Sequence, residues 1–378
     1  MLKSIYGHGM MPAMFGSMLL ITMGLSACQD IQYRPNAVGK DGEVTIVADS
    51  TVWNGPVGEA LHEQIGAYLR TLPAPEPAFD LRQTDIHSER AFTLLKRQKN
   101  LVFVAPLTDT SNVAKFLSSR LDEGARDAVL AGKSAIISRR DLWRRQQQVV
   151  YIVAATTDSL VAIINRSGPD IRYSFDKISR ERMNISMFKR GRQENIEARL
   201  MDKHGFAVNM QHDYFIAIDT TNFVWLRRVV SSDSWRSMFV YYEDHADPST
   251  LTPDWVMAKQ DKLSKTYLQG NLGGYTAIDY RRPFWSENIN FKDHFAYETR
   301  GLWHMIGDGD DGAKVEFGMG GPFNTYAFYD QNDGRIYLLC GMVFAPGYNK
   351  REFLRQMETI AYTFRTKAVA SAAELATK

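Results

Sequence analysis

Three carboxylates stand close together late in the chain, in the run Gly307-Asp308-Gly309-Asp310-Asp311-Gly312. Asp308, Asp310 and Asp311 carry the hard oxygen ligands that Ca²⁺ prefers, so the run is a weak candidate for a calcium site. It lacks the ligand order of an EF-hand, because the position of the closing Glu holds Met319. The run also matches G-x-G-x-x-G, but its carboxylates would repel a pyrophosphate. We favour the simpler interpretation, a solvated acidic turn.

Other catalytic motifs are incomplete. Ala131-Gly132-Lys133-Ser134 resembles the end of a phosphate-binding loop, but Asp127 occupies the position of the first Gly. His62-Glu63 begins a zinc-protease pattern in which Gly66 replaces the second His. The sequence contains no G-x-S-x-G nucleophile motif. We therefore expect no cofactor and no catalytic residue that a motif could identify, although a site assembled from dispersed residues would escape this search.

Basic and aromatic residues cluster in Arg139-Arg140-Asp141-Leu142-Trp143-Arg144-Arg145. The arginines could contact an anion, such as a lipid headgroup or a polysaccharide, with Trp143 as a stacking or interfacial anchor. The alternative is a short amphipathic helix over about 141–146, whose Trp packs inward while its arginines are solvated. We favour the alternative, and the cluster remains a candidate site for anions.

The chain has two cysteines, and each has a different expected role. Leu25-Ser26-Ala27-Cys28 closes an apolar run that follows Lys3, which is typical of a bacterial lipoprotein signal. The apolar run is too short for a comfortable transmembrane span. We expect Cys28 to become the first residue of the mature protein and to carry acyl chains. Gln29, rather than Asp, follows it, which favours the outer membrane. Cys340 lies in an apolar segment and is expected to be a small core residue.

Composition limits the class of protein. The chain has 378 residues, 44% hydrophobic and 23% charged, which are values of a globular protein. Its formal net charge of +2 offers no electrostatic argument for nucleic acid or an acidic surface. A single cysteine beyond Cys28 excludes a disulfide framework, so core packing must stabilise the fold.

Hydrophobic patterning predicts a spacer over 28–42 after the signal peptide at 1–27, and then an N-terminal lobe over 43–204. Segments rich in β-branched residues, such as 43–48, 101–105 and 149–155, are expected to be strands. Amphipathic helices are expected between them, and the charged stretch 169–204 is expected to form two or three helices where two lobes meet.

A C-terminal lobe is predicted over 205–366, followed by an Ala-rich tail over 367–378. Three strands at hairpin spacing precede a helix that begins at Thr252-Pro253, where Thr is a good N-cap. Several strands and a last helix follow. The expected fold is α+β with two lobes, in which helices pack on mainly antiparallel sheets. The element order of the second lobe is similar to the α-β-α sandwich of PsbP and Mog1, and such a likeness gives no function.

Short motifs spread along the mature chain resemble an uncharacterised family of envelope lipoproteins from Gram-negative bacteria of the Bacteroidetes type. The motifs are Pro35-Asn36-Ala37-Val38-Gly39-Lys40, Glu43-Val44, Trp53 with Gly55 and Gly58, Leu72-Pro73, Glu76-Pro77, Asn100-Leu101-Val102-Phe103-Val104, Asp141-Leu142-Trp143 with Gln146, Gly320-Gly321-Pro322-Phe323 and Ala345-Pro346-Gly347. The family is a domain of unknown function and brings no catalytic residues. The resemblance implies a lipoprotein of the cell envelope.

The expected function is a lipid-anchored binding or scaffold module without enzymatic activity. Its expected partners are the membrane, through the lipid on Cys28, and an envelope protein or glycan, with no nucleic acid. The alternative is an envelope hydrolase that acts on glycan or peptide with a dispersed active site. A deep pocket holding carboxylates with perturbed pKa values would favour the hydrolase, and a flat or apolar groove would favour binding.

Overall fold

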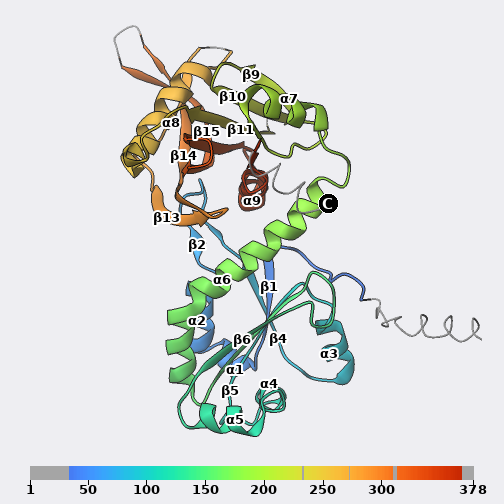
Figure 1. The fold of residues 1–378 in the computed structure, drawn as a ribbon. Coiled ribbons are helices and arrows are strands. Elements are labelled where there is room, and N and C mark those ends of the chain that lie inside the picture. The colour runs from blue at the N-terminus through green and yellow to red at the C-terminus, as the bar shows by residue number, and fades with distance from the viewer. Residues whose placement is uncertain (1–33, 232–233, 272, 310–312, 368–378) are drawn as a thin grey trace, which may run out of the picture.

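The computed structural model describes residues 34–231, 234–271, 273–309 and 313–367. Cys28, Asp310 and Asp311 therefore lie outside the described residues. The chain folds into two lobes, each with its own sheet, and the long helix α6 (Thr157–Met187) runs from one lobe to the other (Figure 1). The α+β class with two lobes is confirmed. Within the described ranges, no helix combines the length and the apolar character that a membrane crossing requires.

The first lobe contains a five-stranded sheet in the order β4-β1-β5-β7-β6. The strands are β1 (Glu43–Val47), β4 (Asp80–Thr84), β5 (Asn100–Pro106), β6 (Ala135–Arg140) and β7 (Gln148–Ala154). All pairs except β6–β7 are parallel. Helical crossovers return the chain to the same end of the sheet, which makes these strands parallel. The expected antiparallel arrangement thus describes the second lobe, and the first sheet is mainly parallel.

Helices cover both faces of this first sheet. The helices are α1 (Ser50–Trp53), α2 (Pro56–Gln64), α3 (Glu89–Leu95), α4 (Asn112–Ser118) and α5 (Glu123–Leu130). One core joins the sheet to α1, α2 and α6, and the other joins it to α3, α4 and α5. The hairpin of β2 (Tyr68–Leu69) and β3 (Glu76–Pro77) extends from this lobe toward the second. Strands β5 and β7 are buried along their whole length, in agreement with their continuous apolar sequence.

The second lobe is an antiparallel sheet between helices. Its strand order is β12-β14-β15-β16-β11-β10-β9, and β13 pairs with β14. The strands are β9 (Phe215–Asp219), β10 (Phe223–Ser231), β11 (Ser234–Glu243), β12 (Tyr275–Ile278), β13 (Trp285–Phe291), β14 (His294–Asp308), β15 (Lys314–Asp330) and β16 (Arg335–Phe344), with β8 (Phe206–Ala207) and β17 (Arg365–Thr366) forming a separate pair. Helices α7 (Glu194–His204) and α9 (Arg351–Ala361) pack on one face and α8 (Pro253–Tyr267) on the other. This arrangement is the expected α-β-α sandwich.

Helix boundaries follow the local chemistry of the sequence. The backbone N–H of Trp255 donates to Thr252 Oγ1 at 3.2 Å, and Pro253 is the first residue of α8, as expected. Gly205 ends α7 with a φ of 78°, a left-handed conformation that glycine adopts without steric cost.

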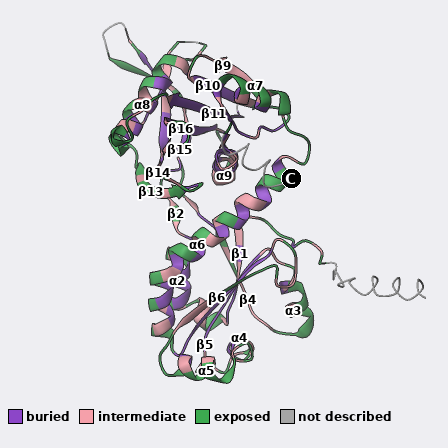
Figure 2. Cartoon of the chain, in the orientation of Figure 1, coloured by how far each residue is buried: buried purple, intermediate pink, exposed green. Residues whose placement is uncertain are grey.

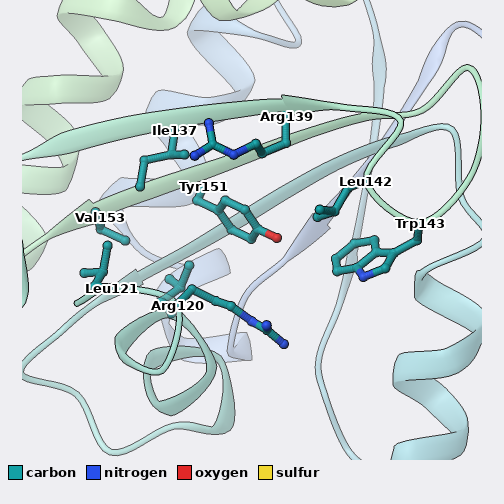
Figure 3. Close-up of a pocket in the computed structure, with 9 residues that line it drawn as sticks. Arg120, Leu121, Ile137, Arg139, Leu142, Trp143, Tyr151 and Val153 are labelled. Atoms are coloured by element: carbon teal, nitrogen blue, oxygen red, sulfur yellow. The ribbon is translucent and has the colours of Figure 1, made fainter. Parts of the chain in front are cut away.

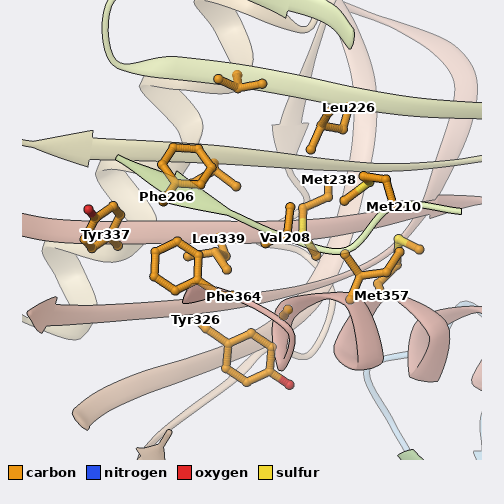
Figure 4. Packing of buried hydrophobic residues seen from close by; sticks show 14 of the residues in the cluster. Phe206, Val208, Met210, Leu226, Met238, Tyr326, Tyr337, Leu339, Met357 and Phe364 are labelled. Atoms are coloured by element: carbon orange, nitrogen blue, oxygen red, sulfur yellow. The ribbon is translucent and has the colours of Figure 1, made fainter. Parts of the chain in front are cut away.

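The inner face of the last helix joins an aromatic cluster in which Phe364, Phe206 and Tyr337 meet (Figure 4).

Helix α6 belongs to both lobes. Its first two thirds bury Ile164 and Phe175 in the first lobe, and its last turns bury Met183 and Met187 in the second. In Figure 2 the buried residues along α6 alternate with exposed ones, because one face of the helix packs against the cores of both lobes. The continuous helix replaces the shorter helices expected from the sequence, and it fixes how the two lobes meet.

Candidate functional site

A cavity of about 740 Å³ lies between the two lobes. The first lobe contributes the β2–β3 hairpin with its flanking residues and α6, and the second contributes β13, β14, β15 and α9. The residues that line it are Ala67, Tyr68, Leu69, Arg70, Thr71, Ala78, Pro169, Asp170, Arg172, Tyr173, Asp176, Arg180, Pro283, Phe284, Trp285, Glu287, Ile289, Asn290, Glu298, Arg300, Tyr326, Arg351, Leu354, Arg355, Glu358 and Tyr362. A volume in this range suits a small molecule or a segment of a polymer.

A buried ion network forms part of the cavity wall. Arg300 donates to Glu358 Oε1 at 2.8 Å, and Arg180 lies 3.8 Å from Glu358 Oε2. Glu298 Oε1 accepts from Arg300 Nε and from the Tyr326 hydroxyl, both at 2.9 Å. Each buried carboxylate therefore faces a cation or a hydroxyl donor, as buried charges require.

The network also crosses from one lobe to the other. Arg355 of α9 donates to Asp176 of α6 at 3.1 Å and to the carbonyl oxygen of Ala78 at 3.2 Å. The Glu76 side chain accepts from the backbone N–H of Lys350 at 2.6 Å, at the start of α9. A carboxylate at this position satisfies the free N–H groups of a helix N-terminus. The first lobe thus caps a helix of the second.

The environments of two carboxylates in the cavity shift their pKa values in opposite directions. Burial raises the pKa of Glu287, and the negative charge of Glu298 adds to that rise. Burial also opposes ionisation of Glu358, but the charges of Arg300, Arg180 and Arg355 outweigh it and hold its pKa below the ordinary value. Glu358 is therefore a fixed anion, whereas Glu287 takes up a proton more readily.

Glu287 and Glu298 are direct partners across β13 and β14. Directly opposed residues of an antiparallel pair project on the same side of the sheet, with their Cβ atoms about 5 Å apart. Like charges placed this way destabilise a sheet, so a functional role is a reasonable explanation for the pair. Arg300 and Tyr326 hold Glu298 in place, while Glu287 remains open to the cavity and solvent.

Four aromatic side chains around the cavity remain exposed. Tyr68 is 65% exposed, Tyr173 55%, Phe284 51% and Trp285 39%. They come from β2, from α6 and from the start of β13 with the residue before it, so both lobes contribute. Grouped exposed aromatic rings mark a surface that another molecule covers.

The predicted basic cluster is a strand end and a turn, not a helix. Arg139 and Arg140 end β6, and Asp141 and Gln146 adopt positive φ values of 53° and 60°, which a helix excludes. Buried Gln147 holds the turn by donating to the carbonyl oxygens of Lys96 and Gln98. This side-chain anchoring explains why the expected helix over 141–146 does not form.

The structure separates the members of that cluster. Arg139 and Trp143 line a second, smaller pocket in the first lobe (Figure 3). Arg140 points elsewhere and pairs with Glu181 of α6. Arg145 forms a backbone bridge with Asn36, and Arg144 is half-buried. As expected, Trp143 packs inward, with its ring centroid 5.8 Å from that of Phe92.

The acidic run contains a single described carboxylate, Asp308, which pairs with Lys314 on the next strand. The charge and hydrogen bond of Lys314 lower the pKa of Asp308. Among the described residues, no group of three or more His, Cys, Asp or Glu side chains is placed to hold a metal ion. The calcium site remains a prediction, because its other two ligands lie outside the described residues.

Cys340 is fully buried in β16, as expected for a core residue. Burial raises the pKa of its thiol to about 12, and a hydrogen bond with Thr325 only partly offsets this. A thiol in such surroundings is inert as a nucleophile.

Sequence patterns did not predict that the residues of the cavity, which lie between positions 67 and 362, come together. The sequence did contain one signal for the pairing of two cavity carboxylates. Glu287 and Glu298 flank a hairpin with its turn at Lys292-Asp293, and counting outward from that turn pairs the two carboxylates. The sequence alone gave no reason to align this hairpin with α6 of the other lobe.

Comparisons with known proteins find similarity to two families without a known function, one in each half of the chain. Residues 37–188 match the family described as Domain of unknown function (DUF8532), and residues 193–363 match Domain of unknown function (DUF4837). The resemblance to an uncharacterised family is confirmed to this extent. No curated protein matches the chain.

Solved structures give a weak likeness. A mutant of the protein Mog1 aligns with a TM-score of 0.29 and 7% identity, covering 43% of this chain and 90% of that chain. A crystal structure from Bacteroides thetaiotaomicron aligns with a TM-score of 0.23 and 8% identity, covering 43% of this chain and 45% of the other. The assignment of the second lobe as a sandwich rests on its own strand order and helix packing.

Proposed function

We propose that this chain is a lipid-anchored binding module of the cell envelope of a Gram-negative bacterium, and that it holds a segment of glycan in the cavity between its lobes. The observation that carries the proposal is that cavity, about 740 Å³ in volume, with exposed aromatic rings contributed by both lobes. Its two lobes are tied together by α6 and by the ion network, so the site is largely pre-formed. Pre-formed sites bind without a large ordering cost.

The aromatic residues argue for a sugar. Trp285, Phe284, Tyr173 and Tyr68 present flat, apolar faces to the cavity region while their neighbours are polar. A pyranose ring has one face of C–H groups that can stack on such a ring and an edge of hydroxyl groups that needs hydrogen-bond partners. A ligand of this mixed character matches the mixed lining better than a purely apolar ligand does.

The charges argue against a highly charged ligand. Six arginines and five carboxylates line the cavity, so their charges nearly cancel. Most of them already pair with one another, as in Arg300 with Glu358 and Arg355 with Asp176. Such fixed pairs can still hydrogen-bond to sugar hydroxyls through their free donors and lone pairs.

Support for the anchor comes from the Leu25-Ser26-Ala27-Cys28 motif at the end of an apolar signal. Gln29 favours the outer membrane over the inner one. Two or more acyl chains would hold the protein at the membrane permanently, because one chain gives only marginal binding. The mature chain would then meet envelope glycans at high local concentration.

A specific observation favours hydrolysis as a second candidate. Glu287 and Glu298 face each other across two strands; burial and the charge of Glu298 raise the pKa of Glu287, and Arg300 holds Glu298 in place. Such a pair could act as general acid and as base or stabilising anion on a glycosidic bond. In that case the cavity would turn over the same class of ligand that it binds.

The test is calorimetric titration of the full chain with soluble fragments of envelope glycans. We expect saturable binding that Trp285→Ala weakens by about tenfold or more, because a central aromatic contact commonly contributes at least 1 to 2 kcal/mol. Phe215→Ala, which removes an aromatic side chain 45% exposed on β9 and outside the cavity, is the matched control.

Mass analysis of the glycan after incubation separates the two candidates. Unchanged glycan supports the binding module, whereas cleavage that Glu287→Gln abolishes supports the hydrolase. Saturable binding that Trp285→Ala leaves unaltered would remove the cavity as the site. Absence of any glycan binding would reject the proposal and direct attention to an envelope protein partner, which crosslinking in intact cells can capture.

A further inference from the structure

A second pocket lies in the first lobe, on the face of the sheet covered by α4 and α5. It has a volume of about 190 Å³ and is lined by Leu117, Arg120, Leu121, Ile137, Arg139, Leu142, Trp143, Tyr151 and Val153. Figure 3 shows Arg139 and Arg120 on opposite sides of the Tyr151 ring, with Leu142 and Trp143 beyond its hydroxyl. The space is too small for a drug-sized molecule and suits a compact group.

Two guanidinium groups and a tyrosine hydroxyl line this pocket, and no carboxylate of the described residues pairs with the two guanidinium groups. Within the part of the chain that the structure describes, neither Arg120 nor Arg139 forms an ion pair with a carboxylate, and Arg139 donates only to the carbonyl oxygen of neighbouring Ser138. The Tyr151 hydroxyl has no hydrogen-bond partner among the same residues, although Tyr151 is only 6% exposed. An anion would complete all three groups.

The charges of Arg120 and Arg139 both affect the Tyr151 hydroxyl. Burial raises the pKa of Tyr151, and the charges of Arg120 and Arg139 both oppose that rise. Both guanidinium groups therefore lie within electrostatic reach of the tyrosine hydroxyl. Aliphatic side chains of Leu117, Ile137 and Val153 form the rest of the wall, so the pocket combines an anion site with an apolar surface.

The start of the described chain is fixed beside this pocket. Arg34 donates to the carbonyl oxygen of Asp141 at 2.7 Å, and the backbone N–H of Ala37 donates to the carbonyl oxygen of Arg145 at 2.9 Å. These contacts join the N-terminal segment to the turn that carries Trp143. Six residue steps separate Cys28 from Arg34, and such a length spans at most about 20 Å.

We infer that this pocket binds the phosphate of an anionic lipid headgroup in the membrane to which the protein is anchored. The inference rests on the proposed lipidation of Cys28 for the membrane's proximity, and it is independent of the cavity between the lobes. A lipid on Cys28 would place Arg34, and with it the turn at 141–145, within about 20 Å of the bilayer surface. The guanidinium groups would bind phosphate oxygens, the Tyr151 hydroxyl would donate a further hydrogen bond, and the aliphatic wall would contact the glycerol part of the lipid.

The experiment measures vesicle binding by the mature chain, from residue 28 onward, with Cys28→Ser, so that neither the acyl anchor nor the apolar signal segment contributes. We expect sedimentation with vesicles of phosphatidylcholine and phosphatidylglycerol, and none with phosphatidylcholine alone. Combining Arg120→Gln with Arg139→Gln should weaken binding roughly 10- to 30-fold, because each basic residue near an anionic surface contributes a few-fold or more. Tyr151→Phe, which removes only the hydroxyl, should weaken it less.

A matched control removes two exposed arginines that line neither pocket, Arg166→Gln with Arg190→Gln. Equal losses in both double variants would indicate nonspecific attraction and overturn the inference. Soluble glycerol phosphate distinguishes the source of the phosphate: binding of this probe without vesicle binding would assign a free anion as ligand and reject the headgroup. Trp285→Ala should keep full vesicle binding, and its failure to do so would place the membrane contact at the other cavity.

Discussion

At the residue scale, two carboxylates of the cavity show how position determines the role of one side-chain type. Glu358 is 5% exposed and lies against Arg300 and Arg180, so its charge is compensated. Glu287 lies opposite Glu298, so its charge is opposed. Loss of the first charge should destabilise the fold, whereas loss of the second should not.

We expect Glu358→Gln to lower the free energy of unfolding by about 3 to 5 kcal/mol at neutral pH, because it leaves buried guanidinium groups uncompensated. Its pKa in the folded protein lies below the ordinary 4.5, so this stabilisation is present above about pH 4.5 and disappears as the pH falls through the folded pKa. Urea unfolding of both proteins across acidic and neutral pH measures the difference.

Two other substitutions check the assignment. Glu352→Gln removes a 38% exposed carboxylate on the same helix and should have a smaller effect. Glu287→Gln should be neutral or slightly stabilising at neutral pH, because its pKa is raised in the folded protein and the unfavourable charge is present only above that pKa. A large destabilisation by Glu287→Gln would contradict the account of the opposed pair.

At the element scale, α6 connects the cores of the two lobes. Pro169 lacks an N–H and disturbs a helix interior, yet α6 continues through it. Packing of Phe175 into one core and Met187 into the other keeps α6 continuous. Tertiary contacts therefore outweigh the local penalty of the proline.

Phe364→Ala tests the packing beyond the end of α9. The ring of Phe364 lies 4.9 Å from that of Tyr337 and 5.6 Å from that of Phe206, measured between centroids. Its removal should lower the free energy of unfolding by about 3 to 5 kcal/mol, the usual cost of a buried Phe→Ala change. Tyr348→Ala, at a residue 62% exposed, should cost much less and serves as the control in thermal unfolding. Equal shifts in Tm would mean that this cluster does not stabilise the lobe.

At the scale of the whole molecule, the proposed tether and the two pockets concern how the protein would meet its surroundings. A lipid on Cys28 would confine the chain to a membrane, and six residue steps to Arg34 would limit the distance of the first lobe from it to about 20 Å at that point. The cavity between the lobes lies where both lobes can contribute to one ligand. The proposed membrane attachment and the proposed ligand binding would thus involve different parts of one molecule.

Cys28→Ser tests the tether. We expect the variant to move from the membrane fraction to the soluble fraction, because the thiol that carries the lipid is gone and one weak headgroup contact cannot replace acyl chains. Fractionation of cells followed by immunodetection measures this, with Cys340→Ser as the control that leaves Cys28 intact. Retention of the Cys28→Ser variant in the membrane fraction would reject the lipid anchor.

The sequence by itself predicted the α+β class, two lobes, the α-β-α order of the second lobe, the ends of α7 and α8 and the burial of Cys340. These features depend on local hydrophobic periodicity and on capping residues such as Thr252 and Gly205, which neighbouring residues determine. It also singled out Arg139 and Trp143, although it expected a helix there.

Only the tertiary structure determined the candidate sites. Pairing of β6 with β7 places Arg139 beside Tyr151, and packing of α4 on the sheet brings Arg120 to the same pocket. The continuity of α6 determined that residues from position 67 to position 362 would surround one cavity. Such contacts join residues far apart in the chain, and their energies depend on packing in three dimensions, which a local pattern does not contain.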